Sequence, residues 1–331
     1  MRKITEQEKI EITRRLRAFQ RPNDLKSYFA VIGNILGLAL CLFANCYLFQ
    51  IAPIYTAFLW LPTAAFLGRI FVCLHDCGHK NLFTTDLPNL IFGRVSAMLI
   101  GLPYKFWQHY HNIHHSIVNN LDKRHLDIES SIMTHDEYKK ASFFKRLRYD
   151  FSRNPVARVF IVPITLYFLN KIPFWFYPKK VIIDTAISTT IYVLLLCLLG
   201  SIISFKGLIF TYGIPVLITQ ILAVAIFALQ HKFEKAYWVE EEGWDHFEVS
   251  LYGSSYLKFG RIMNWYSGNV GFHHIHHLNP KIPFYNLLKS EKAIRDVVPV
   301  TPVYLSTYFK HLKTKVWDFE KGKLVNPNKK K

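Results

Sequence analysis

Residues Val181–Ile203, with the sequence VIIDTAISTTIYVLLLCLLGSII, decide the fold class. A second apolar run, Leu208–Leu229, follows after a short loop that contains Lys206. Runs of about 20 apolar residues match the ~30 Å hydrocarbon core of a bilayer, and a helix satisfies every backbone polar group within it. The two runs therefore indicate an integral membrane protein rather than a soluble domain.

The side of the membrane on which each loop falls decides how often the chain crosses the membrane. Two more long apolar runs lie nearer the N-terminus, whereas the segments at 89–103 and 157–177 are short or are interrupted by proline and basic residues. With four spans, both termini and all histidine clusters fall on one side, and Lys206 is the only lysine or arginine in a loop on the other side. Because basic residues favour the cytoplasmic side, we expect four spans, with interfacial or re-entrant helices for the two weaker segments.

The predicted organisation is a single all-α integral membrane domain over residues 1–331, with four transmembrane helices, interfacial helices and a cytoplasmic helical cap. In chain order its parts are a charged cytoplasmic helix (1–27), spans at about 28–50, 54–74, 181–203 and 208–229, cytoplasmic metal-binding regions at 75–180 and 230–290, and a cytoplasmic tail (291–331). The net charge of +18 lies beside the apolar runs and in no recognisable nucleic-acid-binding module, so no nucleic-acid partner is expected.

Three short stretches on the predicted cytoplasmic side concentrate histidine. Within each stretch the spacing is i, i+4 or i, i+3, i+4, which places the rings on one face of a helix. The members are His75 and His79; His111, His114 and His115; and His273, His276 and His277. His231, at the end of the last span, adds a ninth imidazole. Nine nitrogens exceed the three or four that one zinc ion needs, and imidazole suits iron, copper, zinc or nickel, so the pattern predicts two metal ions.

The remaining histidines do not fit the shared facial spacing and are not expected to be ligands: His109, His125, His135, His246, His274 and His311. Three carboxylates are candidates for orienting an imidazole by accepting its second ring N–H, namely Asp76, Glu234 and Asp245. The alternative for each is a solvated or salt-bridged side chain.

These stretches resemble the histidine boxes HxxxH, HxxHH and HxxHH of the membrane fatty-acid desaturases, most closely the acyl-lipid (glycerolipid) desaturases of bacteria and cyanobacteria. The resemblance covers about residues 60–290 and includes, in order, Trp107, Asn120-Leu121-Asp122, Arg153-Asn154-Pro155, Gln230-His231-Lys232-Phe233-Glu234, Gly253-Ser254-Ser255-Tyr256 and Gly268-Asn269-Val270-Gly271-Phe272. The chain departs from the family pattern at Gln108, where arginine often follows the tryptophan, and at Gly243, where glutamate is common. Neither position is a proposed ligand.

The resemblance implies a non-haem di-iron centre that uses O₂ to remove two hydrogens from neighbouring methylenes of a fatty acyl chain, leaving a cis double bond. It also implies an acyl chain esterified in a membrane glycerolipid, and a bacterial inner membrane with the termini and histidine boxes on the cytoplasmic side. The sequence contains no dinucleotide-binding fingerprint, no ferredoxin-like cysteine run and no fused cytochrome. A separate ferredoxin, flavodoxin or cytochrome is therefore the expected electron donor, and an acidic one would suit a basic cytoplasmic face.

Two other functions remain open at this point. A related di-iron membrane hydroxylase, or an enzyme acting on carotenoid rings, would share the clustered histidines. A metal or proton transporter that uses the histidines as a relay would need ionisable residues near the bilayer midplane, and the predicted spans are nearly free of them.

Overall fold

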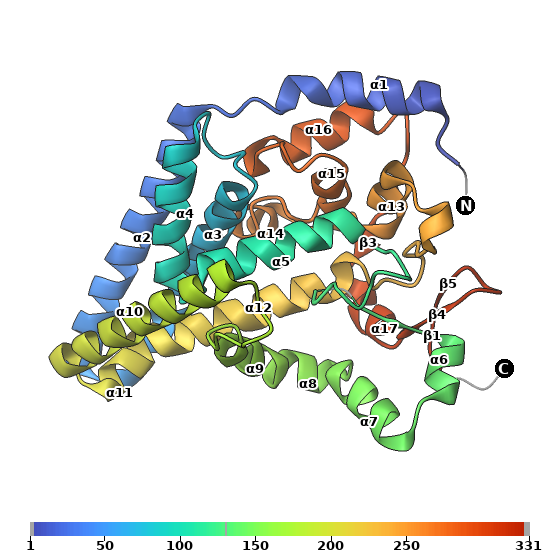
Figure 1. Ribbon diagram of the computed structural model, residues 1–331. Coiled ribbons are helices and arrows are strands. Elements are labelled where there is room, and N and C mark those ends of the chain that lie inside the picture. Colours follow the sequence, from blue (N-terminus) through green and yellow to red (C-terminus); the bar gives the residue numbers. More distant parts are fainter. Residues whose placement is uncertain (1–2, 130, 328–331) are drawn as a thin grey trace.

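The computed structural model describes residues 3–129 and 131–327, so the basic end of the predicted tail lies outside the described residues. Helices dominate the fold (Figure 1). The α-helices are α1 (Glu6–Leu16), α2 (Asp24–Ile51), α3 (Ala57–Gly78), α4 (Asp86–Ile100), α5 (Tyr104–Ile117), α6 (His135–Lys140), α7 (Phe143–Ser152), α8 (Pro155–Phe160), α9 (Val162–Leu169), α10 (Lys179–Ile203), α11 (Phe205–Leu208), α12 (Ile214–Gln230), α13 (His246–Gly253), α14 (Arg261–Tyr266), α15 (His273–Leu278), α16 (Leu287–Ile294) and α17 (Tyr308–Leu312). Tighter or wider turns form η1 (Arg17–Phe19), η2 (Pro53–Thr56), η3 (Ile209–Gly213), η4 (Glu241–Gly243), η5 (Phe284–Asn286) and η6 (Leu305–Thr307).

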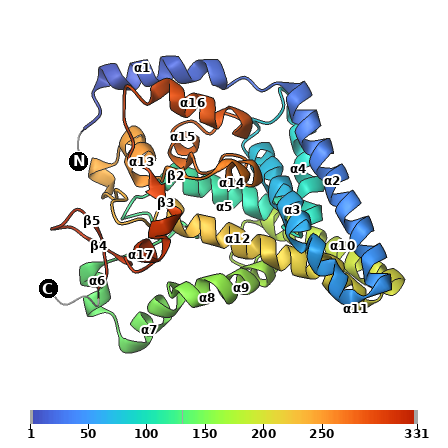
Figure 2. The ribbon, with the colours of Figure 1, turned by 180° about the vertical axis from the view of Figure 1, so that it is seen from behind.

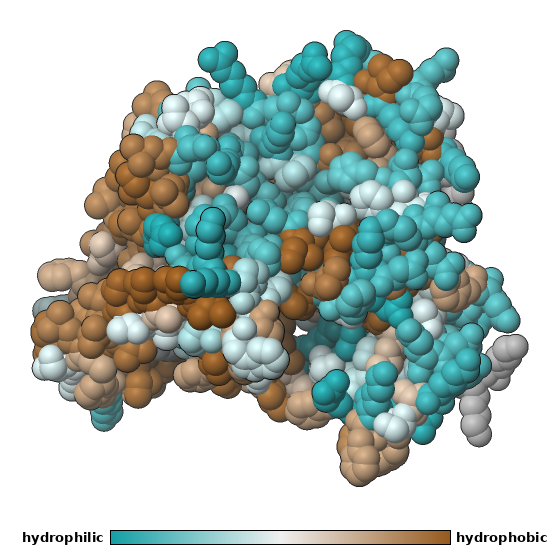
Figure 3. All heavy atoms as spheres, in the orientation of Figure 1, coloured by the Kyte–Doolittle hydropathy of each residue, from teal (hydrophilic) through white to brown (hydrophobic). Residues whose placement is uncertain are grey.

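Four helices within the described residues are long and apolar enough to cross a membrane, as predicted: Asp24–Ile51, Pro53–Gly78, Lys179–Ile203 and Phe205–Gln230. Their apolar side chains form a hydrophobic surface over α2, α10 and α11, at the left and lower left of Figure 3, while the rest of that face is mostly hydrophilic. The helix of the second predicted span continues beyond Leu74 without a break: α3 extends to Gly78, and His79 caps it. A membrane-crossing helix therefore carries two of the candidate ligands directly.

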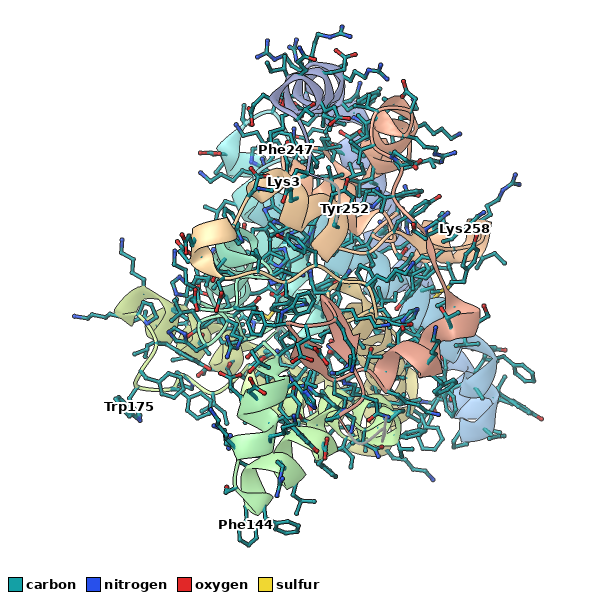
Figure 4. The ribbon with its side chains drawn as sticks, turned by 90° about the vertical axis from the view of Figure 1, so that its right-hand side faces the viewer. Lys3, Phe144, Trp175, Phe247, Tyr252 and Lys258 are labelled. Carbon is teal, nitrogen blue, oxygen red and sulfur yellow. The ribbon has the colours of Figure 1, made fainter. Side chains whose placement is uncertain are left out.

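The two weaker apolar segments do not form helices long enough to span. The first is α4, with 15 residues, and the second is divided into α8 and α9, with six and eight residues. Large apolar side chains nearby are exposed: Phe144 at the start of α7 is 78% exposed and Trp175 after α9 is 87% exposed. Both project away from the body of the protein in Figure 4, as expected for side chains that anchor an interfacial segment in lipid.

The part of the protein away from the hydrophobic surface is a cap of short helices. Helix α1 lies across it above α16 (Figures 1 and 2). Arg15 joins the two helices by donating to the Ala293 carbonyl in α16 at 2.9 Å, and it pairs with Asp296, just beyond α16, at 2.7 Å. The all-α prediction omits five short strands: β1 (Met133–Thr134), β2 (Leu257–Lys258), β3 (Val303–Tyr304), β4 (Val316–Asp318) and β5 (Lys323–Val325). Strand β4 pairs in parallel with β1 and antiparallel with β5, and β2 pairs in parallel with β3.

Helices α3 and α5 approach closely because one residue has no side chain. A Cβ atom on Gly78 would lie 2.3 Å from the Trp107 ring, so only glycine leaves room for that indole. Trp107 in turn stacks on His111, with ring centroids 4.6 Å apart and planes at 21°. This contact fixes the first histidine stretch beside the second.

Candidate metal centre

Four elements bring the nine predicted ligands together. His75 lies in the last turn of α3 and His79 caps that helix, α5 carries the second stretch, α15 carries the third, and His231 directly follows α12. Helix α5 lies between α15 and α12 in both ribbon views (Figures 1 and 2). All three stretches are helical or end a helix, so the i, i+3, i+4 spacing does turn their rings to a common side.

The imidazoles form two groups, in each of which one ring nitrogen per residue lies within 4.8 Å of the others. Group one is His75, His79, His111, His115 and His276; group two is His114, His231, His273 and His277. Residues that are adjacent in sequence belong to different groups. His115 and His276 are in group one, whereas His114 and His277 are in group two. Pairs spaced i, i+4 stay together, because they share a helix face.

Group two closes into a ring of nitrogens. The Nε2 of His231 is 3.1 Å from that of His114 and 2.9 Å from that of His273. The Nε2 of His277 is 2.9 Å from that of His273 and 3.2 Å from that of His114. Imidazole–metal bonds of about 2.1 Å at right angles separate adjacent nitrogens by about 3.0 Å. The four atoms thus have the spacing of adjacent ligands around one ion.

Group one has the same spacing along a chain of contacts. The His111 Nε2 lies 3.1 Å from the Nε2 atoms of both His75 and His115, and the His276 Nε2 lies 2.9 Å from that of His115. The Nε2 of His79 is buried and has no hydrogen-bond partner among the described residues. A metal ion within this group would satisfy that nitrogen.

Carboxylates on the outer side of three rings determine where the ring protons lie. The Nδ1 atoms of His75, His111 and His114 lie 3.0, 3.1 and 2.9 Å from Asp76, Glu129 and Asp127, respectively. Each Nδ1–H donates to its carboxylate, which leaves the Nε2 lone pair directed toward the centre. Two such lone pairs, on His75 and His111, face each other at 3.1 Å and repel unless a cation lies between them. The donor set therefore fits a bound metal.

The surroundings favour the neutral form, which is the form that binds metal, at seven of the nine imidazoles. Burial, reinforced by the neighbouring rings, holds the pKa well below its ordinary value for His79, His115, His231, His273, His276 and His277. Burial also lowers the pKa of His111 to about 4, although Glu129 opposes the shift. At His114 burial is outweighed by Asp127 and Glu129, and its pKa is raised.

The third stretch is held in place through its flanking backbone. Asp76 accepts a hydrogen bond of 2.6 Å from the Phe284 N–H, in addition to its contact with His75. The Asn81 side chain donates to the carbonyls of Pro280 and Ile282. One residue in the last turn of α3 and one just beyond that helix therefore fix the segment that follows α15, and this aligns the first and third stretches.

Of the three carboxylates predicted to orient imidazoles, Asp76 lies against His75, whereas the structure corrects the other two. Glu234 pairs with Lys310 at 2.8 Å and lies 3.5 Å from Lys323. Asp245 caps α13 and pairs with Lys9 at 2.7 Å. Lysine side chains and helix N–H groups, rather than imidazoles, therefore bind these two carboxylates.

Sequence reasoning missed the two carboxylates that lie against the second stretch, Asp127 and Glu129, and also Ser254, whose Oγ is 3.5 Å from the Nδ1 of His231. The six histidines not expected to be ligands lie outside both groups. His274 is buried beside the third stretch, and its ring lies near Tyr256. Asp127 and Glu129 follow α5 in a segment without helical periodicity, so spacing alone gave no reason to choose them.

These observations define an α-helical integral membrane protein with two adjacent groups of histidines suited to metal ions. The model of the family described as "Fatty acid desaturase" matches residues 51–309. A "Fatty acid desaturase" of Bacillus subtilis is 29% identical over 317 residues, covering 96% of this chain and 90% of that protein. An "sn-1 acyl-lipid omega-3 desaturase (ferredoxin)" of Nostoc is 26% identical, covering 90% and 80%. An "Acyl-lipid omega-3 desaturase (cytochrome b5), endoplasmic reticulum" of Arabidopsis thaliana is 26% identical, covering 88% and 75%.

The chain belongs to the fatty acid desaturase family. It is therefore an oxidoreductase of lipid metabolism, and not the histidine-relay transporter that the sequence left open.

Proposed function

We propose that this enzyme uses O₂ to introduce a cis double bond into a fatty acyl chain esterified in a membrane glycerolipid, with two iron ions held by the nine histidines. The observation that carries the proposal is the division of the nine Nε2-bearing rings into two groups, one of five and one of four. Each group has the nitrogen spacing of ligands around one ion. Both groups lie at the end of a membrane-crossing helix, close to the acyl chains of the bilayer.

Two iron ions bound there would activate O₂ for the removal of hydrogen from an unactivated methylene. The protein's own residues prepare the site for that chemistry. Asp76, Glu129 and Asp127 hold the Nδ1 protons and so fix the tautomer and the ring orientation. Trp107 fixes the plane of His111 by stacking. Burial of all four members of group two keeps water away from that half of the centre.

The electrons that the acyl chain does not supply come, in this proposal, from a separate protein. Among the relatives, the Nostoc enzyme is named for ferredoxin and the Arabidopsis enzyme for cytochrome b5. Exposed lysines follow the third histidine stretch at Lys281, Lys289 and Lys292, on the cap that faces away from the hydrophobic surface. A small acidic carrier would be attracted to this face, which we place in the cytoplasm of a bacterial cell, together with both termini.

Lipid analysis tests the proposed reaction. The chain is expressed in a host whose membrane lipids are saturated and simple, with iron and an electron donor supplied, and new double bonds are located by mass spectrometry. We expect acyl chains that have lost two hydrogens, remain esterified in glycerolipid, and are missing when His277→Ala is expressed. Products that have gained an oxygen would indicate a hydroxylase instead. An unchanged lipid profile from iron-loaded enzyme would contradict the proposal.

A further inference from the structure

A pocket of about 350 Å³ lies where the end of α3 meets the first turns of α4 and α5. Its lining combines two leucines with charged and amide side chains, and the members that matter here are Lys80, Asp86, Leu87, Leu90, Lys105 and Gln108. Pockets that hold small molecules have volumes of about 300–1,000 Å³, so this one is large enough for the polar headgroup of a lipid.

The pocket opens along exposed apolar side chains of α4. Leu87 and Leu90, which line it, are 65% and 40% exposed. Ile91 and Val95 continue the exposed side of the helix, at 49% and 41%. Helix α4 lies beside the membrane-crossing helices α2 and α3 in both ribbon views (Figures 1 and 2). Because apolar side chains exposed on successive helix turns favour lipid over water, lipid molecules have access to the pocket from this side.

The two lysines of the pocket are available to an anion. The Lys105 ammonium group forms no ion pair among the described residues, and one of its three N–H groups donates to the amide oxygen of Gln108 at 2.8 Å. Lys80 pairs with Asp86 at 2.9 Å, but these side chains are 60% and 75% exposed. An ion pair so exposed contributes little, so a ligand can replace it at small cost.

The surroundings of Lys105 carry an excess of positive charge. Burial lowers the pKa of Lys105, and the charge of Arg94 lowers it further. Asp184 opposes this shift, whereas Lys80 and Lys180 add to it. Arg94 pairs with Asp184 at 2.9 Å, and Lys80 has its own carboxylate partner, so the charges of Lys105 and Lys180 remain uncompensated. A bound anion would offset them.

We propose that this pocket binds a glycerophospholipid of the membrane, with its phosphate held by Lys105 and Lys80 and its glycerol end and first methylenes against Leu87 and Leu90. The shared chemistry is that of a phosphate group, which an ammonium group binds as a point charge. The leucines in the same lining make a lipid the source rather than free phosphate. The inference does not depend on the proposed desaturation, because it concerns the binding of a lipid and not its turnover.

The test compares two double variants of the full, metal-loaded protein in detergent. Lys80→Gln/Lys105→Gln removes both lysine charges from the pocket, and Lys145→Gln/Arg148→Gln removes two exposed charges from α7 as the matched control. The probe is palmitoyl-oleoyl-phosphatidylglycerol. Palmitoyl-oleoylglycerol serves as the phosphate-free comparison, and inorganic phosphate serves as the competitor. Native mass spectrometry of each titration gives the affinity for the first bound lipid, while metal content and melting temperature report on the fold.

We expect the pocket variant to bind phosphatidylglycerol about tenfold or more weakly than wild type, because two charge-assisted contacts are lost. The α7 variant should bind as wild type does, and palmitoyl-oleoylglycerol should not distinguish the proteins. Wild-type affinity in the pocket variant, or an equal loss in both variants, would overturn the proposal. Inorganic phosphate that binds as tightly as the lipid would overturn the lipid source. If the double variant does not fold, Lys105→Gln alone should weaken binding several-fold, and wild-type affinity would again overturn the site.

Discussion

The Nδ1 of His114 lies 2.9 Å from Asp127 Oδ2, and both side chains are only 2% exposed. This is the most enclosed of the imidazole–carboxylate contacts around the centre, and it fixes the ring that belongs to group two while its neighbour His115 serves group one. The carboxylate holds one tautomer of His114 and compensates the charge that a metal ion brings into a buried site.

Replacing this carboxylate should weaken metal binding without removing a ligand. We expect Asp127→Asn to lower the affinity for the group-two metal by about 10- to 100-fold, since partners of metal-bound histidines have effects of that size. Competition with a chelator, followed by elemental analysis, measures the affinity. Asp136→Asn, an exposed carboxylate in the first turn of α6, is the matched control. Equal metal retention by the two variants would show that Asp127 does not support the site.

The close approach of α3 and α5 gives a second prediction. Gly78→Ala would place a Cβ 2.3 Å from the Trp107 ring, so we expect a destabilisation of about 1–3 kcal/mol from overpacking. Loss of activity should accompany it, because His75 and His111 shift apart. Gly33→Ala in the exposed part of α2, where nothing lies within 4 Å, should instead stabilise the helix by about 0.5–1 kcal/mol. Melting temperatures in detergent measure both, and similar values for the two variants would rule out this role of Gly78.

The metal-free protein should lose stability as the pH falls below about 6.5. In the folded state the pKa values of eight buried histidines are lowered, including His111 to about 4 and His274 to about 3. Below the unfolded value of about 6.5, the unfolded chain therefore binds more protons than the folded chain, and each such group removes up to about 1.4 kcal/mol per pH unit. The raised pKa of His114 has the opposite effect on stability, but it is a single group, whereas eight histidines have lowered pKa values.

Melting of chelator-treated protein between pH 5.5 and 8.5 tests this pH dependence. The midpoint should be nearly constant above about pH 7 and should fall steeply below about 6.5. A flat profile down to pH 5.5 would mean that these imidazoles are protonated in the folded protein as easily as in the unfolded one.

Charge reversal on the cap should slow the delivery of electrons. We expect Lys281→Glu/Lys289→Glu/Lys292→Glu to reduce donor-driven turnover about tenfold or more at low ionic strength, and the difference should shrink at high salt, where surface charges are screened. The control is Lys206→Glu, an exposed lysine in α11, the short helix between α10 and α12. Unchanged rates and an unchanged salt dependence in the triple variant would exclude docking on this face.

The sequence predicted the elements of the centre well because helix periodicity is a local property. Spacing alone placed His111 and His115 on one face of a helix, and hydropathy together with the distribution of lysine and arginine predicted four spans. The allocation of ligands was not predictable in this way. His276 and His277 are adjacent in α15 and therefore point in different directions, and the group that each joins depends on where α5 and α12 lie.

The carboxylates that contact the histidines could not be predicted from local spacing in the sequence either. Glu234 and Asp245 are close in sequence to ligands or to a family motif, yet lysines from distant segments engage them. Asp127 and Glu129 lie 13 and 18 residues beyond the histidines that they contact, in a loop whose path only tertiary structure determines.

Metal content of the purified protein is the most direct test of the central claim, which is that two metal ions are held by two separate sets of histidines. We predict two iron ions per chain in wild type and in His274→Ala, whose imidazole lies outside both groups. His231→Ala and His276→Ala should each retain about one iron, since they remove a ligand from group two and group one, respectively, and both should be inactive. A single iron in the wild-type protein, or full iron content in His231→Ala, would contradict the account.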